Sequence, residues 1–163
     1  MITLAAALFV AGWSVNTCHA GEREERFHLQ SECAETGKKY EEGYFDAELA
    51  MAKAGRKPYS VTARGHYNAK DEHCYVVVEH ANPDAEKLTW TLSLYDGQTD
   101  EVLAYLQADK NHKRFGTIYA FWRVPDSALP KQIPFNKDRT DLYSENQFDR
   151  ANAYVEYLME EHR

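Results

Sequence analysis

The chain has 163 residues, of which 26 are Asp or Glu and 19 are Lys or Arg, so its formal charge is −7. This length is sufficient for one domain with its own hydrophobic core. The acidic balance disfavours nucleic acid as a partner, because phosphate groups require a basic surface. Moderate negative charge either keeps an exported protein in solution or attracts a basic partner.

Residues 1–20 read MITLAAALFVAGWSVNTCHA and contain no Lys, Arg, Asp or Glu. The apolar run is shorter than the roughly 20 residues that span a bilayer, and it is typical of a secretory signal peptide. We therefore expect cleavage after Ala20, a periplasmic or secreted mature chain without a transmembrane segment, and one α+β domain over residues 21–163. Lipid attachment at Cys18 is a weaker alternative, because Val15 and Thr17 match a lipoprotein signal poorly.

Removal of the signal leaves two cysteines, Cys33 and Cys74. Two cysteines in an exported chain most simply form a disulfide. Neither belongs to a CxxC motif, which disfavours both redox exchange and a zinc site.

The first predicted element is a helix over residues 24–54. Its apolar and small residues recur at intervals of three or four and form one stripe: Leu29, Cys33, Gly37, Tyr40, Tyr44, Ala47 and Met51. Cys33 lies on this stripe and is expected to face the core. Gly43 is a position where the helix could break, and Gly55 and Pro58 would end it.

Hydrophobic alternation then predicts strands over residues 59–67, 72–80, 88–95, 101–107 and 117–124. The quartet NAKD is a turn. A four-residue loop that pairs Tyr67 with Glu72 would place one apolar set on a single face: Val61, Ala63, Cys74, Val76 and Val78. We prefer this register, because a slip by one residue would bury polar side chains.

The remaining residues contain an irregular segment and a second helix. Pro125, Pro130 and Pro134 mark the irregular segment, and Ser144 with Gln147 forms a capping box before a helix over residues 145–161. The order predicts an α+β fold: an N-terminal helix, an antiparallel sheet of about five strands and a C-terminal helix. A bond between Cys33 and Cys74 would then fasten the first helix to the second strand.

The predicted register places His66 directly opposite His73, which makes them a weak candidate for a metal site. Two imidazoles supply only half of the ligands that zinc requires, so we expect no metal and no cofactor. The chain has no G-x-S-x-G motif and no phosphate-binding glycine motif, and we expect a protein that is not an enzyme. A hydrolase using His66 or His112 is a third alternative.

Aromatic residues make up 13% of the chain, an excess that can indicate a binding surface. Five of them are placed on outer faces of the predicted sheet: Tyr75, Tyr95, Tyr105, Tyr119 and Phe121. The simpler explanation is that the C-terminal helix or the proline-containing segment covers them.

The segments HYNAKDEHCYVVVE and LYDGQTDEVLAYL, together with the upstream sequence Cys33-Ala34-Glu35, resemble a pattern in small exported bacterial proteins of uncharacterised function. The resemblance covers residues 31–107. It implies a bacterial envelope location and carries no activity. The pair Asp71-Glu72 departs from the apolar and basic residues typical of that turn.

These observations favour a protein that acts by binding another protein, as an inhibitor or immunity protein against a basic enzyme or toxin does. A small-ligand carrier with a pocket between sheet and helix is the alternative.

Overall fold

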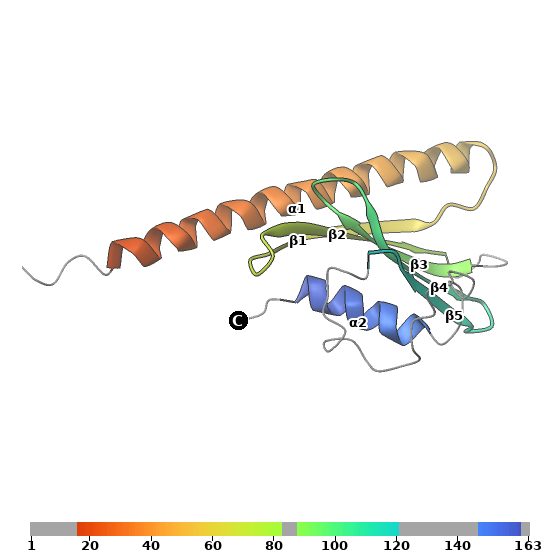
Figure 1. Ribbon diagram of the computed structural model, residues 1–163. Coiled ribbons are helices and arrows are strands. Elements are labelled where there is room, and N and C mark those ends of the chain that lie inside the picture. The colour runs from red at the N-terminus through yellow and green to blue at the C-terminus, as the bar shows by residue number, and fades with distance from the viewer. Residues whose placement is uncertain (1–15, 83–87, 121–146, 161–163) are drawn as a thin grey trace, which may run out of the picture.

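The computed structural model describes residues 16–82, 88–120 and 147–160. Within them, helix α1 (Asn16–Lys53) precedes five strands, and helix α2 (Phe148–Met159) follows them. The strands are β1 (Ser60–Asn68), β2 (His73–Ala81), β3 (Leu88–Asp96), β4 (Val102–Asp109) and β5 (Arg114–Ile118). They form one antiparallel sheet in chain order, with α1 on one face and α2 on the other (Figure 1). The predicted α+β order is confirmed.

Several predicted boundaries change. Helix α1 is unbroken through Gly43, and β5 begins at Arg114, three residues before the predicted strand. Helix α2 begins at Phe148, and the side chain of its N-cap residue Gln147 makes no capping hydrogen bond. Residues 121–124 of the predicted last strand, the three prolines and Ser144 lie outside the described residues.

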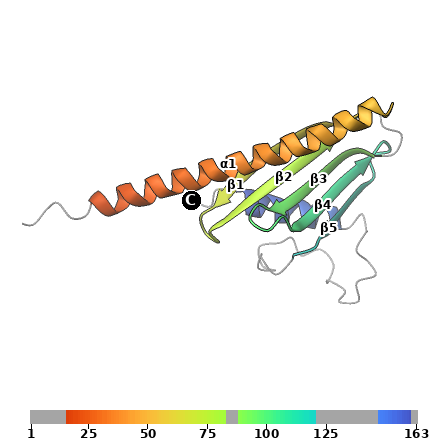
Figure 2. The same cartoon turned by 90° about the horizontal axis from the view of Figure 1, so that it is seen from above.

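Helix α1 lies along the edge strand β1 (Figure 2), and two glycines allow the close approach. A Cβ on Gly65 would lie 1.9 Å from the carbonyl oxygen of Cys33, and a Cβ on Gly37 would lie 2.4 Å from the nitrogen of Gly65. Gln30 of α1 also bonds to the strand: its Nε2 donates to Gly65 O at 3.4 Å, and its Oε1 accepts from Tyr67 N at 2.9 Å. The side chain of Gln30 thereby covers backbone groups at an otherwise open edge.

The predicted register of the first hairpin is wrong by two residues. Tyr67 pairs with Cys74 rather than with Glu72, and the loop comprises residues 69–72. The reason lies in the turn, where Asn68 Oδ1 accepts from Lys70 N at 3.0 Å and Glu72 adopts a left-handed conformation with φ of 54°. Asn68 therefore completes the strand instead of starting the loop.

A slip of two residues leaves the faces of a strand unchanged, so the predicted apolar face is confirmed. Val61, Ala63, Cys74, Val76 and Val78 pack together against α1. Cys33 and Cys74 are paired across this interface, with Cα atoms 5.5 Å apart and 41 positions apart in the chain. The pair joins α1 to β2.

The larger core lies between the opposite face of the sheet and α2. It contains Tyr75, Val77, Leu92, Leu94, Leu103, Leu106, Ala151, Tyr154, Val155 and Leu158. Gly116 permits the contact, because a Cβ there would lie 2.8 Å from Phe148 Cα. The sheet is thus covered on one face along β1 and β2 and on the other along β4 and β5. Among the described helices, none is long and apolar enough to span a membrane.

Candidate functional site

The candidate site is built from three tyrosines where α1 meets the sheet. Tyr40 and Tyr44 lie one turn apart on α1, and both reach Tyr95 of β3. The ring centroids of Tyr40 and Tyr95 are 5.0 Å apart, and those of Tyr44 and Tyr95 are 6.5 Å apart. The hydroxyl groups of Tyr44 and Tyr95 hydrogen-bond to each other. These contacts hold three partly exposed rings in fixed positions.

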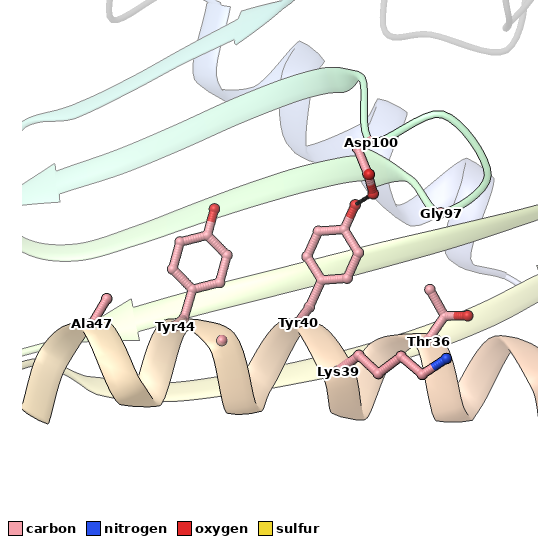
Figure 3. A pocket seen from close by; sticks show the side chains of 8 residues that line it. Thr36, Lys39, Tyr40, Tyr44, Ala47, Gly97 and Asp100 are labelled. Carbon is pink, nitrogen blue, oxygen red and sulfur yellow. Dashed lines mark hydrogen bonds between the residues drawn. The ribbon is translucent and has the colours of Figure 1, made fainter.

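The turn between β3 and β4 supplies the other wall. Asp100 adopts a left-handed conformation with φ of 61°, which Asp tolerates better than most residues. Its carboxylate accepts a hydrogen bond from the hydroxyl of Tyr40 (Figure 3). Gly97 in the same turn donates its N–H to Cys74 O at 2.8 Å. A Cβ at position 97 would lie 2.8 Å from Cys74 Sγ, so the cysteine pair lies directly beneath this wall.

An open groove of about 640 Å³ runs between α1 and this turn. We call it the tyrosine groove; its lining residues are Thr36, Lys39, Tyr40, Gly43, Tyr44, Ala47, Gly97 and Asp100. Figure 3 shows the rings of Tyr40 and Tyr44 pointing from the helix toward the sheet. Three of the lining residues are Gly or Ala, and their small size leaves the space between the aromatic rings and the rim open.

Burial shifts the pKa values of the two helix phenols upward. It raises the pKa of Tyr40 well above its ordinary value, and the hydrogen bond to the Asp100 carboxylate raises it further. Burial likewise raises the pKa of Tyr44, with a second contribution from the hydrogen bond to Tyr95. The groove presents aromatic surface, with Lys39 and Asp100 as its charged lining residues.

The aromatic contacts continue beyond the groove. The ring of Tyr44 meets His80 edge-on at 4.9 Å, and the ring of Tyr59 lies 6.4 Å from His80. Glu48 supports both neighbours: its Oε1 lies 3.7 Å from His80 Nδ1, and its Oε2 accepts from Tyr59 N at 2.9 Å. The Glu48 carboxylate on α1 thus holds His80 and the backbone of Tyr59 beside Tyr44.

The aromatic residues predicted to form one outer surface do not lie together. Tyr75 is 1% exposed and belongs to the core beneath α2. Tyr95 and Tyr105 lie on the α1 side, since Val76 pairs with Tyr95 and Ser93 pairs with Tyr105. Tyr119 follows β5 and is 41% exposed. Phe121 lies outside the described residues.

The groove tyrosines of α1 were predicted as ordinary core residues of the helical stripe. A signal was nevertheless present in the sequence, because Tyr40 and Tyr44 alternate with Gly43 and Ala47 on adjacent turns. Large rings beside very small residues leave a hollow when they pack against another element. The helical stripe alone could not show that the opposing surface is a turn rather than a strand.

The predicted pair of opposed histidines is also corrected. His66 lies opposite Tyr75, and His73 lies opposite Asn68, because the register moved by two residues. His73 Nε2 instead contacts the fully buried Asp96, with 3.1 Å between Nε2 and Oδ2. His112 lies in the exposed turn between β4 and β5. In the described part of the chain, no three His, Cys, Asp or Glu side chains are grouped so that they could hold a metal ion.

Comparison of the chain with protein-family models, with curated proteins and with solved structures finds no match in any of the three.

Proposed function

We propose that this is an exported protein that acts by binding a basic protein partner, and that the partner docks in the tyrosine groove. The observation that carries the proposal is the set of Tyr40, Tyr44 and Tyr95, partly exposed and held against one another beside an open groove. Tyrosine is favoured at protein-binding sites, because it offers a large rigid surface with a polar end.

Two further features favour a protein partner of positive charge. The formal charge of the chain is −7, so acidic groups outnumber basic ones on its surface. Such a surface attracts a basic partner and accelerates its association. The groove is open along its length, so a polypeptide can enter and leave it without being enclosed. An inhibitor or immunity protein against a basic enzyme or toxin of the envelope is the class that fits these features.

A photo-crosslinking amino acid at position 39 tests the proposal in the organism of origin. Lys39 lines the groove, whereas Lys110 lies in the exposed turn between β4 and β5 and is the matched control position. We expect a defined crosslinked protein with the probe at 39 and none with the probe at 110. The captured protein, once purified, should bind more weakly in salt.

Substitution of the tyrosines then locates the binding energy. Tyr44→Ala should weaken binding of the captured protein by at least about tenfold, as loss of a central aromatic contact does. Tyr119→Ala, also a partly exposed tyrosine, should leave the affinity unchanged. Equal capture at positions 39 and 110, or unchanged affinity of the Tyr44 variant, would exclude the groove as the binding site.

A small-ligand carrier is the second candidate, because 640 Å³ falls within the range of about 300–1,000 Å³ that is typical of small-molecule sites. Such sites usually enclose most of the ligand surface, which an open groove does not do. Native mass spectrometry of the exported protein distinguishes the two candidates. A retained small molecule that disappears in the Tyr44→Ala variant would favour the carrier.

A further inference from the structure

A second surface lies on the outward side of α1 and contains two large apolar side chains. Phe45 is 59% exposed, and Leu49, one helical turn later, is 43% exposed. Each follows a groove residue, Gly43 or Ala47, by two positions, which corresponds to a rotation of about 200° around a helix. The pair therefore lies on a different flank of α1 from the tyrosine groove. Adjacent exposed apolar side chains of this size are typical of a docking surface.

The charges beside this pair are arranged asymmetrically along the helix. Glu42 lies one turn before Phe45, and Lys53 lies one turn after Leu49. Both charged residues are exposed. These four residues therefore read, along the chain, as acidic, apolar, apolar and basic, which is an order that is complementary to its own reverse.

We propose that this flank of α1 binds a second copy of the chain, with the two helices antiparallel. In this arrangement Phe45 packs against Leu49 of the second copy, and Glu42 faces Lys53 of the second copy. A two-fold axis repeats each contact, so one patch serves both copies. A parallel arrangement would instead place Glu42 against Glu42 and Lys53 against Lys53, and like charges would repel.

Asp46, which is exposed and directly follows Phe45, adds a second acidic group beside the apolar pair. Arg56 lies beyond the end of the helix, and its guanidinium turns back to Met51 Sδ at 3.5 Å, away from the outward flank. In Figure 2, α1 lies at the outside of the molecule with the sheet to one side of it, so its outward flank is accessible along the second half of the helix. The tyrosine groove stays open in the dimer, and the proposal does not depend on what the groove binds.

The contact is small, because each copy contributes two partly exposed apolar side chains and two charges. We therefore expect a weak dimer with a dissociation constant of about 10–100 μM, below the affinity of standard-sized interfaces. Sedimentation equilibrium of the exported protein, purified after expression of its full-length precursor, measures this constant from about 1 μM to about 1 mM.

Charge reversal tests the orientation of the helices. Glu42→Lys and Lys53→Glu should each weaken the dimer about tenfold, because the two-fold axis repeats every repulsive contact. The double variant Glu42→Lys/Lys53→Glu should recover the wild-type constant, since it restores both pairs with exchanged signs. Lys110→Glu in the turn between β4 and β5 changes the net charge by the same amount as Lys53→Glu and should have no effect. Far-UV circular dichroism verifies that each variant is folded.

The apolar contact has its own test. Phe45→Ser/Leu49→Ser should be monomeric over the whole concentration range, and both positions are exposed, so folding should be preserved. The proposal is overturned if the wild-type protein is monomeric at the highest concentration or if the double-serine variant dimerises normally. It is also overturned if the double variant Glu42→Lys/Lys53→Glu does not recover the dimer affinity that each single variant loses.

Discussion

Gly65 of β1 lies so close to α1 that a Cβ at this position would be 1.9 Å from the carbonyl oxygen of Cys33. The obstacle is backbone on both sides, so no side-chain rotation can relieve it. The contact lies beside the cysteine pair and sets the distance between helix and sheet on which the tyrosine groove depends.

Gly65→Ala is therefore expected to destabilise the protein by about 3 kcal/mol or more, at the upper end of overpacking effects. Gly43→Ala is the matched control, because a Cβ there meets nothing within 4 Å and Ala is favoured over Gly in a helix by about 1 kcal/mol. Urea unfolding measures both. Similar stabilities for the two variants would contradict the close contact between α1 and β1.

The pairing of Cys33 with Cys74 should contribute strongly to stability after export. Chain-entropy estimates for a loop of this length give about 3–4 kcal/mol, and Cys33→Ala/Cys74→Ala should lose about that amount. The intact mass of the exported protein should be lower by two hydrogens than that of the reduced chain. A protein isolated with both thiols free, or an unchanged urea midpoint after reduction, would contradict this prediction.

Tyr40 and Tyr44 should make the fold sensitive to alkaline pH. Their pKa values are raised in the folded protein by burial, whereas the unfolded chain titrates near 10. The folded state therefore retains protons that the unfolded state loses, and its stability should fall as pH rises above about 10. Ultraviolet titration should show late-ionising tyrosines. Tyr44→Phe should remove one of them.

In two turns of the sheet, an Asp carboxylate accepts hydrogen bonds from backbone N–H groups of the residues that follow it. The two Asp residues differ in how deeply they are buried. Asp96 is fully buried and accepts from Gln98 N, Thr99 N and His73 Nε2. Asp96→Ala should cost about 3 kcal/mol, because it removes a fully buried acceptor on which three donors converge. Asp109 accepts from the backbone N–H groups of Asn111 and Lys113 in an exposed turn, and Asp109→Ala should cost less in the same urea experiment.

Asp109 should make the stability of the fold depend on acidic pH. The N–H of Lys113 is the main cause that holds the pKa of Asp109 below its ordinary value. The resulting stability is present at neutral pH and should be lost as pH falls through the lowered pKa. Asp109→Asn should remove this part of the acid dependence. A carboxyl resonance of Asp109 that titrates at the ordinary value in NMR would contradict the prediction.

The sequence alone determined the order of elements and the inward face of the first hairpin. Both follow from local periodicity: intervals of three and four residues gave α1, and alternation placed Cys74, Val76 and Val78 on one face. The same alternation explains why a register error of two residues left the faces correct. It could not set the register itself, which depends on the side chain of Asn68 and the left-handed Glu72.

Only the tertiary structure decided which faces are covered and where a site forms. Tyr75 and Tyr95 were both predicted to lie on an outer face, yet α2 buries the first and α1 leaves the second beside an open groove. Periodicity identifies the apolar side of each element but not the element that will pack against it. The groove also required the turn carrying Gly97 and Asp100 to meet a helix some sixty positions earlier, and long-range proximity of that kind arises only when the chain is folded.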